Sequence, residues 1–454
     1  PKLLTAISDL EVLNEEEEGF LWHIRYPVID QKDELIVATT RPETLLGDVA
    51  VAVHPEDERY KHLIGKTIIL PIVGREIPLF ADEYVDKNFG TGAVKVTPAH
   101  DVNDYEMALR HNLEMINIFN EDATTNNNVP LEFRGLDRFE VRKKIVARFE
   151  EFGLLVKVED YQNRVGYSER GGVPIEPYLS EQWFMKMDEI VKPAIEVVQN
   201  GSVKFHPAHW SKTYFNWLMN IKDWCISRQL WWGHRIPVWY HKETKEIYCD
   251  VTPPKDLENW KQEEDVLDTW ASSWLWAHGV FKTEEEKKYF YPTDLLVTAP
   301  DILFFWVARM IIAGLHFEKE IPFKDVYFTS VIRDMQGRKM SKSLGNTVEP
   351  NKVVKQSGAD ILRLWASSID YQSDVRISDE LLKQVIENYK KMRNTFRFIL
   401  GNISDFTEED KVILKDLPKV DTYILGELNR IIKLSLHAYR NFDYKTMVSA
   451  ISNF

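Results

Sequence analysis

The segment Arg338-Lys-Met-Ser-Lys-Ser-Leu-Gly-Asn346 gives the strongest indication of fold and chemistry in this chain. Lys339 and Lys342 stand three residues apart, with the hydroxyl residues Ser341 and Ser343 beside them. Two lysine charges at this spacing can neutralise the charge that grows on a leaving pyrophosphate, and the serine hydroxyls can donate hydrogen bonds to phosphate oxygens. The alternative is an ordinary surface loop, because Lys and Ser are common in loops.

The charge of the chain is unevenly distributed around this segment. Residues 331–400 contain 13 Lys+Arg and 8 Asp+Glu, a net charge of +5. The whole chain carries −14, so the other 384 residues carry −19. The overall acidity argues against general affinity for nucleic acid, but a basic segment can still bind a polyanion locally. The acidic run Glu15–Glu18 is interpreted as a solvated loop.

Length and composition limit the class of protein. At ~150 residues per domain, 454 residues predict about three domains. Only two cysteines are present, which excludes a disulfide scaffold and a four-thiolate zinc site. No apolar run reaches ~18 residues and no basic-then-apolar leader is present, so we expect a cytoplasmic protein without a membrane segment. The chain begins without Met and ends inside a helical pattern, so we expect a fragment of a longer protein.

Hydrophobic patterning predicts a multidomain α/β protein with three structured parts after a connecting segment, residues 1–18. Residues 19–171 contain short β-branched runs ended by Gly, Pro or Asp, and two helices, Asn103–His111 and Arg138–Phe152. In residues 172–375, strands such as Leu295–Thr298 and Asp325–Thr329 alternate with helices, which favours a parallel sheet. Residues 376–454 show apolar helical stripes starting near Ser378, which predicts a helical bundle.

The block Phe89-Gly-Thr-Gly-Ala-Val-Lys-Val-Thr-Pro-Ala-His-Asp-Val-Asn-Asp104 places chemically active side chains at one strand-to-helix junction. Its Gly-Thr-Gly turn would let the backbone approach a ligand closely. Lys95 and Thr97 are two residues apart on a strand and so share a face. Asp101 and Asp104 follow at the start of a helix, which Asp101 or Asn103 can cap. The alternative is a capped helix with a solvated lysine.

These segments resemble the class I aminoacyl-tRNA synthetases. Lys339-Met-Ser-Lys-Ser343 looks like their second signature, and four further segments resemble the valine-specific members, the valyl-tRNA synthetases. These segments are Ala38-Thr-Thr-Arg-Pro-Glu-Thr44, the run Asn220–Pro237, Val266-Leu-Asp-Thr-Trp270 and Phe304-Phe-Trp-Val-Ala-Arg-Met310. The resemblance implies an inserted β-rich editing domain at 19–171, the second half of a Rossmann-like catalytic domain at 172–375, and the start of an anticodon-binding domain at 376–454.

The resemblance also implies two sites. An editing pocket that hydrolyses threonine wrongly attached to tRNA-Val would be lined by Arg41, Phe89, Lys95, Thr97, Asp101 and Asp104. In the synthetic site, Lys339, Ser341, Lys342 and Ser343 would assist catalysis, and Met340, Lys342 and Asp301 would contact ATP. Trp232 and Trp270 would form a flat apolar wall of the amino-acid pocket, with plain core packing as the alternative for both. Ala299-Pro300 stand before Asp301 where many relatives carry Gly-Tyr, which weakens that assignment.

The same resemblance implies ATP with Mg²⁺, valine and tRNA-Val as ligands, and a monomer. We expect no structural zinc and no resident metal, since Ser168-Glu-Arg-Gly171 occupies a place where some relatives carry cysteines. The His-x-Gly-His signature of the family is absent from the chain, so we expect editing to be the activity that it retains. The last ~100 residues look more like an isoleucyl-tRNA synthetase, which leaves that enzyme as an alternative. A non-catalytic tRNA-binding fragment is the second alternative.

Overall fold

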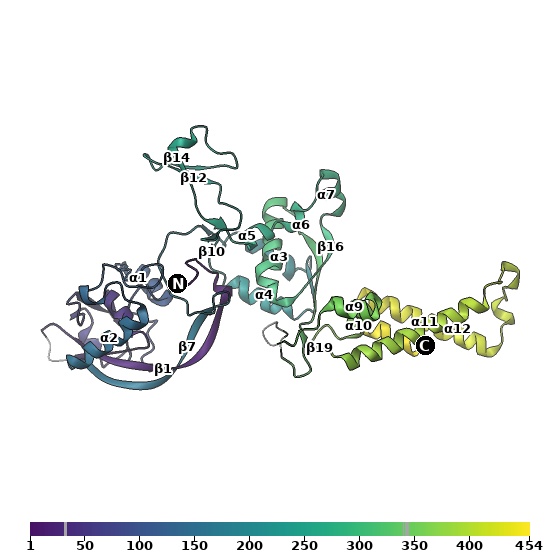
Figure 1. Ribbon diagram of the computed structural model, residues 1–454, viewed down its shortest axis with the longest axis horizontal. Coiled ribbons are helices and arrows are strands. Elements are labelled where there is room, and N and C mark those ends of the chain that lie inside the picture. Colours follow the sequence, from purple (N-terminus) through teal and green to yellow (C-terminus); the bar gives the residue numbers. More distant parts are fainter. Residues whose placement is uncertain (31–33, 339, 341–344) are drawn as a thin grey trace. The chain divides into compact units, whose positions relative to one another are not determined.

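The computed structural model describes residues 1–30, 34–338, 340 and 345–454. The chain divides into two compact units (Figure 1). The first unit contains Pro1–Met185 and Asp223–Thr269, and the second contains Lys186–Lys222 and Trp270–Phe454. This division does not follow the four segments expected from the sequence, because residues 223–269 cluster with Pro1–Met185, and Trp224–Cys225 pairs with Phe184–Met185 there. The assignment of those segments to named domains stays a prediction.

Two sheets build the larger part of the first unit. One sheet has the order β2-β1-β7 and is antiparallel, with β1 (Val12–Pro27), β2 (Glu34–Thr39) and β7 (Leu155–Ser168). The other has the order β4-β5-β3-β6, with β3 (Ala50–Val53), β4 (Thr67–Ile69), β5 (Glu76–Ala81) and β6 (Ala93–Val96). Helices α1 (Val102–His111) and α2 (Arg138–Glu151) match the two predicted helices within one residue.

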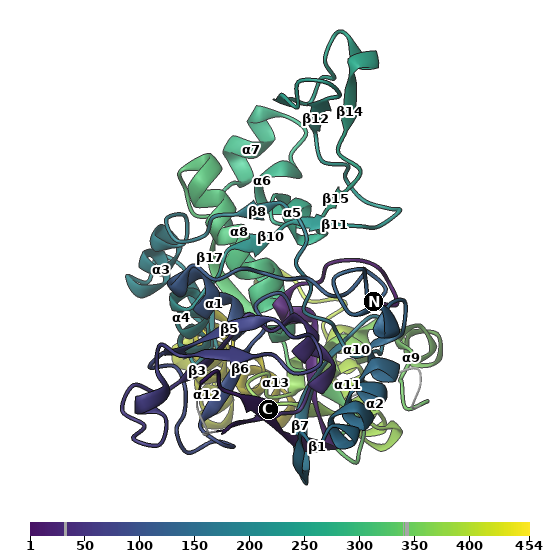
Figure 2. The ribbon, with the colours of Figure 1, turned by 90° about the vertical axis from the view of Figure 1, so that its left-hand side faces the viewer.

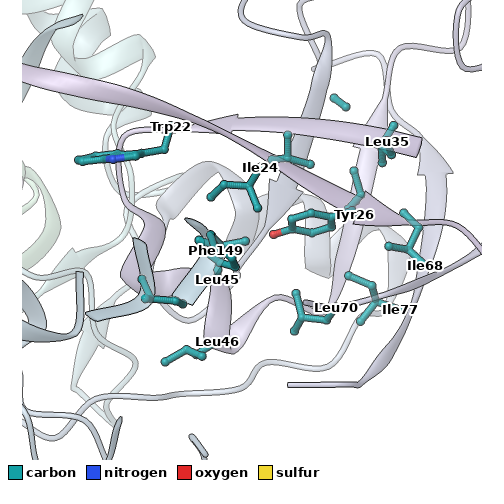
Figure 3. Packing of buried hydrophobic residues seen from close by; sticks show 14 of the residues in the cluster. Trp22, Ile24, Tyr26, Leu35, Leu45, Leu46, Ile68, Leu70, Ile77 and Phe149 are labelled. Carbon is teal, nitrogen blue, oxygen red and sulfur yellow. The ribbon is translucent and has the colours of Figure 1, made fainter. Parts of the chain in front are cut away.

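Alternation along β1 explains how the core of this unit forms. Ile24 and Tyr26 are fully buried while Arg25 between them is partly exposed, as expected for a strand with one face on the core. They pack with Leu35 of β2 and Phe149 of α2 in one apolar cluster (Figure 3). Burial of such side chains is the main force that stabilises this sheet and helix against each other.

The prediction of a loop at Glu15–Glu18 was wrong. These residues lie within β1 and pair with β7, from Glu15 opposite Val165 to Glu18 opposite Gln162. The two strands form the long curved ribbon seen in Figure 1. All four glutamates are exposed. Because neither face of the strand packs on the core at this point, four consecutive charges are tolerated there. The connecting segment expected at residues 1–18 therefore already contains strand from Val12 onward.

Residues 223–269 add three small antiparallel sheets to the first unit. These pair β8 (Phe184–Met185) with β10 (Trp224–Cys225), β11 (Ser227–Arg228) with β15 (Val266–Leu267), and β12 (Val238–His241) with β13 (Ile247–Cys249) and β14 (Trp260–Gln262). Both views show β12 and β14 side by side (Figures 1 and 2). On this last sheet the ring of Tyr248 packs against Trp239 at a tilt and against Trp260 in a T-shaped arrangement.

The second unit contains the predicted parallel sheet. Its order is β16-β17-β9, with β16 (Thr293–Thr298), β17 (Phe323–Phe328) and β9 (Lys204–His206) all parallel. The helices between and before these strands are α3 (Lys192–Gln199), α4 (Trp210–Met219), α5 (Trp270–Ser273), α6 (Trp276–Gly279), α7 (Glu284–Phe290) and α8 (Ala308–Ala313). A short parallel pair follows, β18 (Ile332–Arg333) with β19 (Val375–Arg376).

Helices occupy the rest of the second unit, and a helical bundle was predicted for its residues 376–454. They are α9 (Pro350–Ser357), α10 (Ala359–Ser368), α11 (Asp379–Asn402), α12 (Lys419–Arg440) and α13 (Tyr444–Asn453). Ser378 caps α11 through a hydrogen bond from the Leu381 amide to its hydroxyl. Within the described ranges one helical stretch, Pro300–Glu318, is long and apolar enough by length and composition to cross a membrane, and half of that stretch is buried inside the structure. Core helices of globular proteins meet the same criteria.

Candidate functional site

The strand-to-helix junction predicted from Lys95 to Asp104 forms as expected. Strand β6 pairs antiparallel with β3, so Lys95 lies opposite Val51. Asp101 caps α1 by accepting hydrogen bonds from the amides of Asn103 at 2.8 Å and Asp104 at 3.2 Å. The Asp104 carboxylate turns back and accepts the amide of Thr97 at 2.8 Å. One carboxylate thus fixes the helix start, and the other ties the helix to the strand.

Lys95 and Thr97 share a face, as predicted, but neither is solvated. The Lys95 ammonium donates to the Thr97 hydroxyl at 2.5 Å, and this hydroxyl donates to Asp48 Oδ1 at 2.6 Å. The Lys95 nitrogen lies 3.6 Å from the same carboxylate oxygen. Tyr26 donates its hydroxyl to Asp48 Oδ2 at 2.7 Å. The alternative of a solvated lysine beside a capped helix is therefore wrong, because Lys95 has a buried counter-charge.

Burial sets the protonation behaviour of the two carboxylates in this cluster. Loss of hydration raises the pKa of Asp104 to about 7, with the nearby Lys95 charge opposing the rise and Asp101 adding to it. Burial also raises the pKa of Asp48, against the pull of Lys95 and of the hydroxyls that donate to it. A carboxyl group that titrates near neutral pH can both accept and release a proton under physiological conditions.

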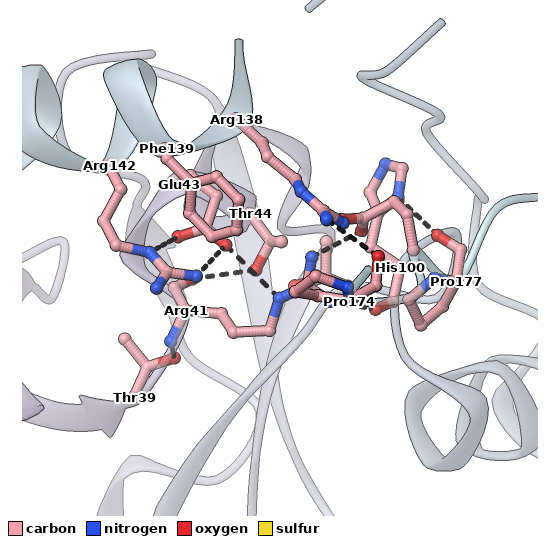
Figure 4. A network of polar contacts seen from close by, with 12 residues as sticks. Thr39, Arg41, Glu43, Thr44, His100, Arg138, Phe139, Arg142, Pro174 and Pro177 are labelled. Atoms are coloured by element: carbon pink, nitrogen blue, oxygen red, sulfur yellow. Dashed lines mark hydrogen bonds and ion pairs between the residues drawn. The ribbon is translucent and has the colours of Figure 1, made fainter. Parts of the chain in front are cut away.

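Arg41 lies in a network of buried ion pairs (Figure 4). Its guanidinium donates to the His100 carbonyl at 2.9 Å and pairs with Glu43 at 3.3 Å and with Glu176. The network continues on both sides, since Arg138 pairs with Glu176 at 2.6 Å and Arg142 holds both oxygens of Glu43 at 2.7 Å. All three guanidinium nitrogens of Arg41 thus have protein partners, so Arg41 anchors the loop that carries His100.

His100 is a buried neutral imidazole that holds two distant segments together. Its Nδ1 lies 3.1 Å from the Pro177 carbonyl, and its Nε2 lies 3.0 Å from the Ile118 amide nitrogen. Since an amide can only donate, Nε2 accepts and Nδ1 carries the proton. Burial lowers the pKa of His100 to about 4. The side chain therefore stays neutral through the physiological range.

Phe89, the remaining residue predicted for the editing pocket, lies on the turn before β6. Half of its surface is exposed, and its ring contacts the edge of Tyr161 at 6.2 Å between centroids. The structure brings Lys95, Thr97 and Asp104 into direct contact and places Asp101 at the cap beside them. Whether Arg41 and Phe89 contact a substrate with them stays a prediction.

Sequence reasoning missed the acids that organise this site. Asp48 receives the hydroxyls of Tyr26 and Thr97, and Glu43 and Glu176 hold Arg41. Asp48 had a detectable signal, because it is a single carboxylate inside the apolar run 45–53. Such a residue is buried only when a partner compensates its charge.

The structure describes only some of the residues predicted for the synthetic site. Trp232 lies in the first unit with 88% of its surface exposed, and Trp270 lies in the second unit, where it stacks on Phe305 at 5.2 Å. Asp301 is exposed in the turn after β16. Met340 packs against an apolar cluster that includes Trp365. Lys339, Ser341, Lys342 and Ser343 lie outside the described residues, so their roles stay predictions.

The residues that flank the lysine–serine segment are joined by one carboxylate. Asp334 accepts hydrogen bonds from Arg338 Nε at 2.8 Å and from Asn346 Nδ2 at 2.9 Å. The bond from Asn346 is the main cause that lowers the pKa of Asp334 to about 2, and Arg338 adds to it. Among the described residues, no three His, Cys, Asp or Glu side chains are grouped closely enough to hold a metal ion.

Comparison with known proteins adds relatives that cover the chain from end to end. The valine–tRNA ligases of Anoxybacillus flavithermus and Geobacillus stearothermophilus are each 52% identical to it over 460 residues, which is 100% of this chain and 52% of theirs. The Thermotoga maritima valine–tRNA ligase is 49% identical over 464 residues, 100% of this chain and 53% of its own. The chain thus spans about half the length of the curated relatives it matches.

Among solved structures, the ternary complex of Agrobacterium radiobacter K84 agnB2 LeuRS-tRNA-LeuAMS matches with a TM-score of 0.47 and 17% identity, covering 97% of this chain and 56% of that one. The family model described as tRNA synthetases class I (I, L, M and V) matches residues 1–378. Because this model covers more than three quarters of the chain, the protein belongs to the class I tRNA synthetases of that group.

Proposed function

We propose that this chain carries the hydrolytic editing site of a valine–tRNA ligase and the part of its synthetic site that holds the lysine–serine segment. The whole enzyme would attach valine to tRNA-Val using ATP and Mg²⁺. The editing site would hydrolyse threonine wrongly attached to the same tRNA. In that step water attacks the ester carbonyl, a new carbon–oxygen bond forms, and the bond to the ribose oxygen breaks. The products are threonine and uncharged tRNA.

The observation that carries this proposal is the convergence of Lys95, Thr97 and Asp104 at one junction. Threonyl ester differs from valyl ester by a hydroxyl in place of a methyl group, and both carry an α-ammonium. The ionised Asp104 can accept a hydrogen bond from either the ammonium or the hydroxyl. The buried Thr97 hydroxyl donates to Asp48 and accepts from Lys95, so Thr97 holds the Lys95 ammonium in a fixed position. Lys95 donates one hydrogen to Thr97 and pairs with Asp48, and a remaining hydrogen of its ammonium would serve an ester oxygen.

A separate editing pocket follows from the chemistry of the substrates. A hydrophobic pocket shaped for valine rejects an isostere with one hydroxyl by only about 10², a limit whose usual example is the valine enzyme against threonine. A second pocket that requires the hydroxyl discriminates far better, because an apolar analogue leaves its polar groups unpaired. A site in which buried acceptors surround a lysine fits the second kind of pocket.

The synthetic half of the proposal rests on family membership and on motif. Lys339 and Lys342 would stabilise the leaving pyrophosphate, with Ser341 and Ser343 as hydrogen-bond donors. ATP with its Mg²⁺, valine and tRNA-Val would be ligands of the whole enzyme, which we propose to be a cytoplasmic monomer. The alignments with the valine relatives cover the whole chain and so include its helical tail. This coverage favours valine over isoleucine.

Deacylation by the chain itself tests the proposal. The chain is incubated with Thr-tRNA-Val and with Val-tRNA-Ile, and release of the amino acid is followed. We expect hydrolysis of Thr-tRNA-Val, with preference for Val-tRNA-Ile contradicting the valine assignment. Asp104→Asn should abolish most of the activity, while the control Glu106→Gln, an exposed carboxylate of the same helix, should not. Retained tRNA binding without hydrolysis in the wild-type chain would favour a non-catalytic tRNA-binding fragment.

A further inference from the structure

Two neighbouring side chains of the loop at residues 54–61 hold the turn that carries Phe89. The Arg59 guanidinium donates Nη2 to the Lys87 carbonyl at 2.7 Å. The Tyr60 hydroxyl donates to the Thr91 carbonyl at 2.8 Å. These two carbonyls lie two residues before and two residues after Phe89. The loop thus grips the turn at both ends, with Phe89 at its centre.

Arg59 is itself held in a fixed orientation. Its Nε and Nη2 form a bidentate pair with Asp57, at 2.9 Å to Oδ1 and 2.6 Å to Oδ2. Asp57 is buried, and its hydrogen bonds to Arg59 lower its pKa. Bidentate arginine–carboxylate pairs are stronger and more directional than single hydrogen bonds. Because Asp57 fixes the plane of the guanidinium, the remaining hydrogen of Nη2 points at the Lys87 carbonyl.

Gly92 makes room for this guanidinium. A Cβ atom built on Gly92 would lie 2.3 Å from Arg59 Nη2 and 3.0 Å from Asp57 Oδ2. Its φ of +77° is also one that favours glycine. The sequence suggested that the Gly-Thr-Gly turn serves close approach of a ligand. At Gly92 that interpretation was wrong, because the space is occupied by Arg59.

We propose that Arg59 and Tyr60 are positioning residues that clamp the turn so that Phe89 is presented to the aminoacyl end of the tRNA. This inference rests on the proposed editing function. The half-exposed ring of Phe89 is a surface on which a base or a sugar can stack. A turn held at one end only would let this ring move, and misplacement by about 1 Å can cost about a hundredfold in rate.

Hydrogen exchange of the full chain tests the clamp directly. Exchange of peptides covering residues 86–93 is measured in the wild type, in Arg59→Ala and in Tyr60→Phe, which removes only one hydroxyl. We expect at least about a tenfold faster exchange in both variants, since amides of the turn bond within it. The control Lys61→Ala removes an exposed ion pair with Glu58 on the same loop and should leave exchange unchanged. If residues 86–93 exchange as slowly in both variants as in the wild type, the proposed clamp is refuted.

A double-mutant cycle tests whether the clamp acts through Phe89. Arg59→Ala and Phe89→Ala are combined, and deacylation of Thr-tRNA-Val is measured for each single variant and for the pair. If Arg59 acts by positioning Phe89, the double variant loses no more activity than Phe89→Ala alone. Losses that multiply would refute this coupling. A wild-type chain that leaves the ester intact would refute the editing function and with it this use of the clamp, while the exchange data would still decide whether the clamp exists.

Discussion

Acidification should destabilise the first unit through His100, and the size of the effect follows from its two contacts. In the folded chain its Nε2 must accept the Ile118 amide, 3.0 Å away. Protonation would place a second donor against that amide. The folded pKa is about 4, whereas an unfolded histidine titrates near 6.5. The imidazole therefore contributes stability that is complete above pH 6.5 and is lost as the pH falls toward 4.

The expected loss is large enough to measure. Integrating the proton uptake between these two pKa values gives about 2–3 kcal/mol lost between pH 7.5 and pH 4.5. Asp104 changes stability in the opposite direction over the same range, because its folded pKa is raised above its unfolded value. The difference between the wild type and His100→Gln separates the two effects, since Asp104 is present in both.

Urea unfolding at pH 7.5 and pH 4.5 provides the assay, with hydrogen exchange of peptides from β6 and α1 reporting the transition of the first unit. At pH 7.5, His100→Gln should cost about 1–3 kcal/mol through its lost hydrogen bonds. At pH 4.5 that deficit should shrink by about 2–3 kcal/mol or reverse. The exposed His234 of the first unit supplies the control His234→Gln, which should follow the wild type. A deficit of His100→Gln that is equal at both pH values would refute the reasoning.

Three further outcomes follow from the site. Deacylation should rise with pH through about 7 as Asp104 loses its proton, and a pH–rate profile should lose this step in Asp104→Asn. Gly92→Ala should destabilise the first unit by more than Gly65→Ala in thermal unfolding, because both have positive φ but only Gly92 faces Arg59; equal losses would contradict the clash. Tyr26→Phe should cost about 1–3 kcal/mol in urea unfolding, because it removes a donor from a buried carboxylate.

Short-range sequence patterns correctly predicted helix starts and the residues that share a strand face. Asp101 and Ser378 were expected at helix starts, and both accept amide hydrogen bonds there. Lys95 and Thr97 were expected on one face of a strand, and they are in contact. In each case the interacting groups lie within a few residues, so the period of the strand or the helix determines their geometry.

Long-range pairing explains what the sequence did not predict. Asp48 reaches Lys95 only because β3 and β6 pair in the register that sets Val51 against Lys95. Glu176 pairs with Arg41 across 135 residues of sequence. No local pattern specifies either contact, and both change the chemistry, since they give two basic side chains of the predicted pocket buried carboxylate partners.

The turn at Phe89 shows how one pattern supports two physical explanations. A glycine with positive φ is required wherever a neighbour comes closer than a Cβ would allow. The sequence does not say whether that neighbour is a ligand or part of the protein itself. Here the neighbour is Arg59, which Asp57 orients. The glycine then serves the substrate indirectly, because its missing side chain lets a guanidinium fix the turn. The aromatic ring on that turn, rather than its backbone, is what remains available to the substrate.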